Sequence, residues 1–310
     1  MNHGRKEIYT DVMEVTADNI LDVLRKAEVI HRENAKDITE LLNIEKNDVP
    51  KYGKKLTRKD IDFWVPMSLP SLITKFWQSY DWGNPITLIQ RGEKDSGIQS
   101  ESDGIALLNE CYESQFIRKK SQGLGRFVTI AGIGNVLVEI NSEWQEGESP
   151  FTIDTLDPRY SFIVRSIAYP DRRKVLGVSF RKNDAGDTFY TCYTPKSRFL
   201  IDVVKSEINI FEEKNPLGLI PIIEYFRDFD RMGCFERQIP EIKAISRMVS
   251  DTINQQNQNT NSLWHANDIE FPKDDDGNEK RPGSGEWVVT QTTRDGRQPF
   301  LKPIVMDYNY

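Results

Sequence analysis

The stretch VLGVSFRKNDAGDTFYTCYT (residues 175–194) decides the fold class of this chain. Apolar and polar side chains alternate in VLGVSFRK and again in DTFYTCYT, which is the period of a half-buried β-strand. NDAG (residues 183–186) separates the two runs, and Asn, Asp and Gly are residues that favour a tight turn. The stretch therefore predicts an antiparallel hairpin.

Six further runs of the same period flank this hairpin. They are NVLVEIN, FTIDTLD and SFIVRSIAY before it, and RFLIDVV, EINIFEE and IPIIEYFRD after it. Clusters of Gly, Pro, Asn and Asp separate the runs, as expected of strands joined by hairpin turns. Helical periods precede them along the chain. This order predicts an α+β fold, with a mostly antiparallel sheet over residues 136–228.

The first 55 residues are charged and helical in period. DNILDVLRKAEVIHREN (residues 18–34) places its apolar side chains on one broad face, and Asp18 or Asn19 is the expected N-cap. The members of that face are Ile20, Leu21, Val23, Leu24, Val29 and Ile30. We expect this segment either to cover another part of the structure or to lie as an arm on a neighbouring molecule.

Two more helices and a strand are predicted before residue 136. One helix begins near Pro70 and ends before WGNP (residues 82–85), where Gly, Asn and Pro stop it. ITLIQ (residues 86–90) then reads as a strand, and the second helix covers about residues 103–118 and runs on toward Ala131. The side chains expected to face inward from this helix are Ile105, Leu108, Tyr112, Phe116 and Ile117.

A long helix is predicted over residues 240–264, and the composition of its second half is unusual. Pro240 suits a first helical position, and apolar residues then recur every three or four positions. From residue 250 to 262 the chain has one charged residue, Asp251, and one apolar residue, Ile253. Because Asn, Ser and Thr are poor formers of a helix interior, two interpretations are open: a helix packed between partners, or a disordered polar linker.

The remaining residues, 268–310, predict a small β module. EWVVTQTT and PFLKPIVM are expected to pair across the turn RDG, with Trp287 as the apolar anchor. KDDDGNE within this region resembles a calcium loop, but the register that aligns Gly277 puts Pro272 and Gly283 at ligand positions. We interpret it as a solvated loop.

Composition limits the classes of function. The chain has 310 residues with 41 basic and 48 acidic side chains, a net charge of −7. This balance excludes a protein that coats nucleic acid with basic groups. Three separated cysteines argue against a disulfide framework, no apolar run is long enough to cross a bilayer, and the N-terminus lacks the apolar stretch of a signal peptide.

No catalytic or cofactor motif was found. GLG and GIG (residues 123–125 and 132–134) do not complete a phosphate-binding loop and are interpreted as close backbone packing or a helix break. The three histidines are too scattered for a metal site, and no CxxC occurs. We predict no enzyme activity, cofactor or metal, while a nuclease built from dispersed carboxylates stays open as an alternative.

Several segments, in order along residues 84–267, resemble the portal proteins of tailed double-stranded DNA bacteriophages, in the branch of long-tailed phages of Gram-positive hosts. The resembling residues are WGNPITL, IDTLDPRYSFIV, the hairpin with its YTP, and PEIKAISRMVSDTIN. NPLGLIPIIEYFRDFDRMGCFE (residues 215–236) is the most similar segment. Family members are usually longer: a returning stem helix, a tunnel loop and a crown follow the clip, and this chain ends where the clip gives way to them.

The resemblance implies a division of the chain and a function. It implies an N-terminal helical arm (residues 1–60), a wing domain (61–232), a stem helix (233–267) and a clip (268–310). The protein would form a homo-oligomeric, usually dodecameric, ring at one capsid vertex of the virion. Its implied partners are the terminase large subunit, scaffold and major capsid proteins, the head–tail adaptor and, weakly and without sequence preference, double-stranded DNA; no membrane is implied.

The predicted site residues fall into three groups. The residues expected to line the DNA channel are Gln255, Gln256 and Asn259. Uncharged amides contact phosphates without the counterion release that strengthens binding by Lys and Arg. The residues expected to pack the stem and subunit interface are Ile242, Ile245, Met248 and Ile253. The residues expected to face the terminase and connector from the clip are Glu286, Trp287 and Arg294. A capsid or tail accessory protein without a channel is the other alternative.

Overall fold

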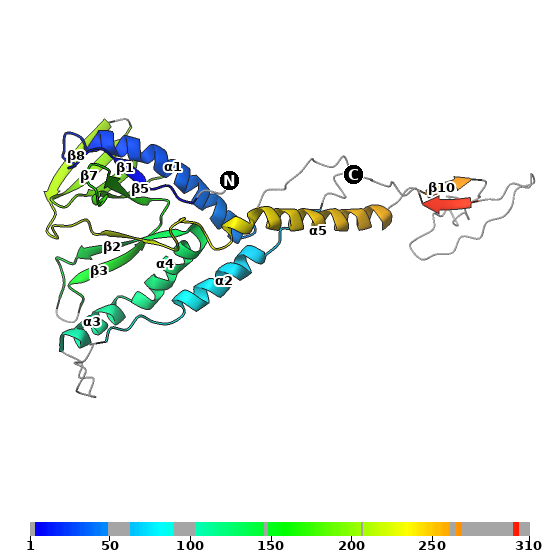
Figure 1. The fold of residues 1–310 in the computed structure, drawn as a ribbon, viewed down its shortest axis with the longest axis horizontal. Helices are drawn as coiled ribbons and strands as arrows, with labels where there is room; N and C mark the ends of the chain where they lie inside the picture. Colours follow the sequence, from blue (N-terminus) through cyan, green and yellow to red (C-terminus); the bar gives the residue numbers. More distant parts are fainter. Residues whose placement is uncertain are drawn as a thin grey trace, which may run out of the picture. The chain divides into compact units, whose positions relative to one another are not determined.

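The computed structural model describes residues 4–48, 63–89, 103–145, 148–205, 207–260, 264–267 and 300–303 (Figure 1). The chain divides into two compact units. The first unit is Met1–Val49 with Met67–Pro240, and the second is Pro50–Pro66 with Glu241–Tyr310.

In the first unit, four described helices come before most of the strands along the chain. The helices are α1 (Ile20–Glu45), α2 (Leu69–Trp82), α3 (Asp103–Ser114) and α4 (Ile117–Ala131), with a short 3₁₀ turn η2 (Glu236–Gln238) near the end. The strands are β1 (Ile8–Thr10), β2 (Ile133–Ile140), β3 (Phe151–Leu156), β4 (Ser161–Ser166), β5 (Lys174–Lys182), β6 (Thr188–Tyr193), β7 (Ser197–Val204), β8 (Glu207–Lys214) and β9 (Ile222–Phe226).

The predicted α+β fold is confirmed, and each of the eight runs of period two is a strand. They form two sheets instead of the single sheet expected: β1-β4-β5-β6-β7-β8 and β3-β2-β9. The hairpin read first from the sequence is β5–β6, with Lys182 opposite Thr188. The pairs are antiparallel except for β1 with β4, where the three-residue strand β1 lies parallel. β1 was not predicted, because three residues are too few to show a period.

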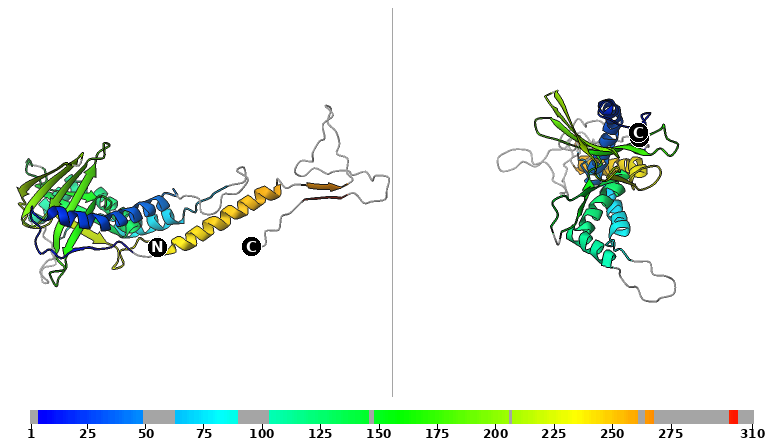
Figure 2. Two further views of the ribbon diagram at one scale, coloured as in Figure 1. Left: turned by 90° about the horizontal axis from the view of Figure 1, so that it is seen from above. Right: turned by 90° about the vertical axis from the view of Figure 1, so that its left-hand side faces the viewer.

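Helix α1 covers one face of the six-stranded sheet and crosses its strands (Figures 1 and 2). Of the two alternatives for the N-terminal segment, the structure shows the first: α1 packs on the sheet of its own chain. Most of the predicted apolar face packs there, but Val29 is 61% exposed, so its assignment to that face was wrong. Asn19 occupies the N-cap position without a capping hydrogen bond, since its side-chain oxygen accepts instead from the Thr16 amide at 2.9 Å.

The second, three-stranded sheet lies between the larger sheet and the helices α2 and α4. Leu137 and Leu156 pack toward Ile163 and Tyr193 of the six-stranded sheet. The alternate residues of β2 and β3 point the other way and pack against α4. The period of two thus places one set of side chains in each of two cores. The first unit is layered as helix, sheet, sheet and helices.

The helices between residues 69 and 131 differ from prediction in two places. The helix expected over residues 103–118 breaks, because Phe116 has a left-handed backbone (φ 55°) between α3 and α4. The predictions that Phe116 and Leu108 face inward were wrong, since they are 74% and 39% exposed. Residues 86–89 of the expected strand ITLIQ are not in a strand. The interpretation of the glycine pairs is confirmed for Gly125, where a Cβ would lie 2.3 Å from the Trp82 ring, and for Gly132 (φ +77°), which ends α4; Gly123 lies within α4 and has open space beside it.

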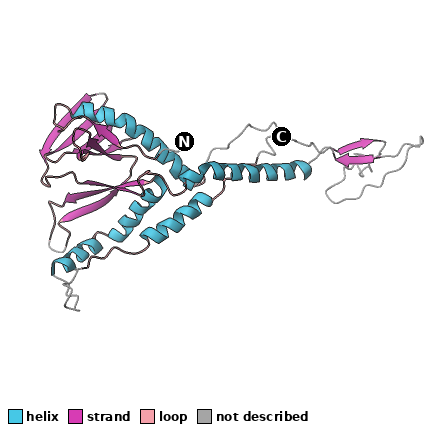
Figure 3. Ribbon diagram, in the orientation of Figure 1, coloured by secondary structure: helices cyan, strands magenta, loops and turns pink. Residues whose placement is uncertain are grey.

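The second unit is built on one continuous helix, α5 (Ile239–Thr260), which begins at the end of the first unit (Figure 3). The strands β10 (Trp264–Asn267) and β11 (Phe300–Pro303) pair antiparallel beyond it. The helix predicted to reach Trp264 therefore ends earlier, and Trp264 begins a strand. The expected pairing of EWVVTQTT falls outside the described residues, and so do Glu286, Trp287 and Arg294. None of the described helices is both long and apolar enough for a membrane span.

Candidate functional site

The buried face of α5 is mainly polar. Its most buried side chains recur every four residues, so they form one stripe along the helix. The members of the stripe are Ile242, Ser246, Ser250 and Asn254. A stripe with three polar members out of four is stable only where those groups find hydrogen-bond partners.

Ser250 and Asn254 bind the backbone of residues 63–65, which belong to the same unit. The Phe63 amide donates to Oδ1 of Asn254 at 2.8 Å, and Nδ2 of Asn254 donates to the Phe63 carbonyl at 3.0 Å. The Val65 amide donates to Oγ of Ser250 at 3.0 Å. A side-chain amide matches the donor and acceptor pattern of a peptide bond, so Asn254 serves here as a strand neighbour would.

The serine hydroxyls complete the stripe within the helix. Oγ of Ser250 donates to the Ser246 carbonyl at 2.7 Å, and Oγ of Ser246 donates to the Ile242 carbonyl at 2.8 Å. These contacts satisfy the hydroxyl protons while leaving the oxygen of Ser250 free to accept from Val65. In this part of α5, polar side chains therefore bind the backbone of residues 63–65.

The opposite side of α5 is exposed and nearly uncharged beyond its first turn. Its exposed residues are Ala244, Arg247, Met248, Asp251, Thr252, Gln255 and Gln256. The two charges among them, Arg247 and Asp251, are one turn apart and form an ion pair of 3.6 Å with each other. The exposed side therefore presents amide, hydroxyl and thioether groups with no net charge.

The predicted channel residues lie on this helix. Gln255 and Gln256 are exposed, and Asn259 follows Gln255 by one turn, although its side chain is outside the described residues. The four residues predicted to pack the stem are not all buried. Ile242 is buried, and Ile245 and Ile253 are half-buried, but Met248 is 64% exposed, so it does not face the core of its own chain.

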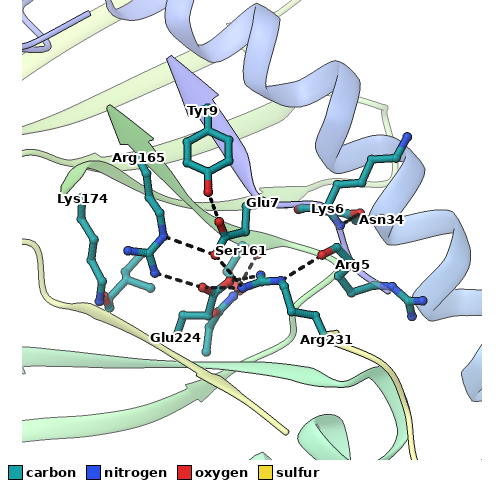
Figure 4. Close-up of polar contacts among 12 residues, drawn as sticks. Arg5, Lys6, Glu7, Tyr9, Asn34, Ser161, Arg165, Lys174, Glu224 and Arg231 are labelled. Atoms are coloured by element: carbon teal, nitrogen blue, oxygen red, sulfur yellow. Dashed lines mark hydrogen bonds and ion pairs between the residues drawn. The ribbon is translucent and has the colours of Figure 1, made fainter. Parts of the chain in front are cut away.

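A network of buried ions connects the two sheets of the first unit (Figure 4). Arg231, in the loop after β9, donates to both carboxylate oxygens of Glu224 in β9, to Oε2 from Nη1 at 3.1 Å. Arg165 of β4 approaches the same carboxylate at 3.5 Å, and Glu7 lies 3.6 Å from Arg231. Because Glu224 and Arg231 are almost fully buried, each depends on the other for charge compensation.

The N-terminal segment is held at the same place. The Arg5 amide donates to the Arg231 carbonyl at 3.0 Å, and Nε of Arg231 donates to the Arg5 carbonyl at 2.9 Å. The buried guanidinium of Arg5 also pairs with Glu236. A small cavity beside this network has room for about one water molecule. Oδ1 of Asn135, which lines it, has no protein partner.

No cluster of His, Cys, Asp and Glu suited to a metal ion occurs in the described part of the chain. Burial raises the pKa of Cys192 to about 12, so this thiol stays protonated and is a poor nucleophile. His31 is enclosed by Phe162 and Phe180, donates from Nε2 to the Arg159 carbonyl at 2.9 Å, and has its pKa lowered by burial.

Sequence reasoning missed the contacts of Ser250 and Asn254 and the ion network. One signal was present for the first: Ser246, Ser250 and Asn254 recur at the spacing of one helix face. No comparable signal existed for the network, whose members come from four separate segments.

A protein-family model matches most of the chain. The family model described as phage portal protein, SPP1 Gp6-like, matches residues 27–309. A search of curated proteins found no match.

Proposed function

The chain belongs to the SPP1 Gp6-like family of phage portal proteins, and on this basis we propose that it is the subunit of a homo-oligomeric ring at one capsid vertex. Double-stranded DNA passes through the ring during packaging and ejection. The match over residues 27–309 is the observation that carries the proposal. The branch we assign, long-tailed phages of Gram-positive hosts, rests on the segments quoted from residues 84–267.

We assign the parts of the portal as follows: residues 1–60 to an N-terminal arm, 61–232 to the wing, 233–267 to the stem and 268–310 to the clip. Two observations support this division. The first compact unit ends at Pro240, at the start of α5, and the short strands β10 and β11 pair beyond the helix. Within this division, the N-terminal segment contributes α1 to the core of the wing.

The exposed side of α5 is the surface we assign to the DNA path, with Gln255, Gln256 and Asn259 as its lining. What supports the assignment is the absence of net charge among the exposed residues described beyond the first turn of α5. A cation at each such position would pair with phosphate and release counterions, and the effect would be multiplied around the ring. Uncharged amides let DNA slide.

The partners we assign are a dodecamer of this chain, the scaffold and major capsid proteins, and double-stranded DNA bound weakly and without sequence preference. In the clip, Glu286, Trp287 and Arg294 would contact the terminase large subunit during packaging and the head–tail adaptor afterwards. Trp287→Ala is expected to weaken binding to both partners, measured with the wing intact by circular dichroism. Unchanged affinities would contradict the assignment.

Ring formation tests the proposal. The full chain should sediment as a closed oligomer and appear as rings by negative-stain microscopy. A monomer at all concentrations, up to those reached in a capsid assembly reaction, would overturn it and favour a non-channel accessory protein. Plasmid cleavage with Mg²⁺ or Mn²⁺ tests the nuclease alternative. Portal proteins are structural, and we expect no cleavage.

A further inference from the structure

The two edges of the six-stranded sheet carry opposite charge around an apolar centre. We propose that these edges meet in the assembly: the β8 edge of one copy docks on the β1 edge and β4–β5 turn of the next. The inference rests on the proposed ring and names the surfaces that close it.

The β8 edge has an exposed apolar residue at its centre and exposed glutamates toward both ends, with Lys205 and Lys214 flanking them. Every second residue of this strand points to the face of the sheet away from α1. Phe211 is on that face and is 57% exposed. Glu207 and Glu213 lie on the same face, two or four positions away, and both are exposed. In the described structure neither glutamate has an ion-pair partner. The other face of β8 is used internally, since Ile210 packs on the core under α1.

The opposite edge is apolar at its centre and basic around it. Ile167, which extends the pairing of β4 with β1 through its amide, is 59% exposed. Arg172 and Arg173, in the turn between β4 and β5, are exposed. Arg172 lies over the Tyr9 ring, 5.4 Å from its centre, and Nη1 donates to the Tyr9 hydroxyl at 3.3 Å.

The aromatic contacts hold both guanidinium groups at this edge. Arg173 stacks over Tyr169 at 4.1 Å and also pairs with Asp171 at 3.2 Å. Residues 165–174 contain four cations, Arg165, Arg172, Arg173 and Lys174, against the single acid Asp171. Arg165 is already paired with Glu224 and Lys174 is half-buried, so Arg172 and Arg173 are the cations that this edge offers to an acidic partner.

The two surfaces cannot meet within one chain. β1 and β8 are the terminal strands of the sheet, with four strands between them. Five interstrand steps of about 4.8 Å separate β1 from β8 by roughly 24 Å, and the β4–β5 turn is three to four steps, roughly 14–19 Å, from β8. Two complementary surfaces on opposite sides of one rigid body make head-to-tail contacts, which close into a ring when the rotation permits. A second copy is therefore the partner that fits both edges.

Reciprocal charge reversal tests the contact. One variant is Glu207→Lys with Glu213→Lys, and the other is Arg172→Glu with Arg173→Glu. Each variant alone then presents like charges at the contact, and we expect at least about 100-fold weaker assembly by analytical ultracentrifugation. An equal mixture restores opposite charges at every contact, and we expect rings of the two variants together. Asp184→Lys, in the exposed β5–β6 turn, is the matched control and should assemble like the parent.

The mixture separates a lost contact from a lost fold, because misfolded variants would not rescue each other. Rings from each variant alone, at the parental affinity, would overturn the edge contact and leave the proposed function standing. Two variants that fail alone and also fail together, while both keep the parental circular dichroism and melting temperature, would overturn it as well. A parent that never forms rings would refute the proposed function itself.

Discussion

Asn254 of α5 and the backbone of Phe63 exchange two hydrogen bonds, at 2.8 and 3.0 Å, across 191 positions of sequence. This relationship explains why a helix of low intrinsic propensity carries an asparagine on its buried face. The amide replaces the strand neighbour that residues 63–65 would otherwise need.

Asn254→Ala should destabilise the contact by about 1–3 kcal/mol, because it removes both hydrogen bonds to the Phe63 backbone, each worth about 0.5–1.5 kcal/mol. Ser250→Ala should have a smaller effect, since only the Val65 amide loses its acceptor. The measurement is hydrogen exchange of the Phe63 and Val65 amides, which should accelerate in the corresponding variant. Gln255→Ala, on the exposed side, is the control. Parental exchange at Phe63 in Asn254→Ala would contradict the contact.

Ile242→Asp and Met248→Asp should differ sharply. Ile242 is buried, so the charge is expected to cost a few kcal/mol of folding stability, about 3 or more. Met248 is exposed, so its substitution should change urea unfolding by no more than about 0.5 kcal/mol. If Met248 contacts a neighbouring subunit, its variant will lower assembly without lowering stability. Equal losses of stability in the two variants would contradict the burial described for α5.

Glu224→Gln should be strongly destabilising, by about 3–5 kcal/mol, because Arg231 and Arg165 keep their charges in a buried site without the carboxylate. Urea unfolding measures this loss. Glu33→Gln is the matched control: it removes an exposed ion pair with Lys6 and should leave unfolding nearly unchanged. A Glu224→Gln variant that unfolds like the Glu33→Gln variant would show that the network does not hold the two sheets together.

His31 should make stability depend on pH. Burial lowers its pKa in the folded state below the ordinary 6.5, so the unfolded chain takes up the proton first as pH falls. The stability that neutral His31 contributes is complete above pH 6.5 and is lost as pH falls from there toward the folded-state pKa. His31→Gln, which keeps a donor for the Arg159 carbonyl, should show a smaller drop in unfolding free energy between pH 7.5 and 5.5. The same drop in both proteins would refute the role of His31.

Local patterns in the sequence were sufficient for much of the fold. The period of two identified all eight described strands between residues 133 and 226, and Pro240 located the start of α5 to within one residue. Patterns of this kind report one element at a time. They did not show that the strands form two sheets. They also did not show that Met248 is exposed, because the buried and exposed faces of this half-polar helix have similar compositions.

The rest depends on contacts between distant residues. Arg5 and Arg231 are 226 positions apart, and the sequence around each of them does not indicate that they are in contact. β1 forms because Arg231 and Asn34 hold the residues before it, with Nδ2 of Asn34 donating to the Lys6 carbonyl at 2.8 Å. A three-residue strand has no period of its own and becomes visible only when those partners are in place.

The rate of DNA packaging tests the central claim, that the exposed side of α5 lines the DNA path of a portal ring. The variant combines Gln255→Lys, Gln256→Lys and Asn259→Lys, and its control carries alanine at the same three positions. Each phosphate engaged by a lysine should steepen the salt dependence of DNA binding by roughly one unit, and the ring multiplies the effect. We predict that packaging slows or stalls with the lysine variant and proceeds at the parental rate with the alanine control. Packaging at the parental rate by lysine-bearing rings would contradict the claim.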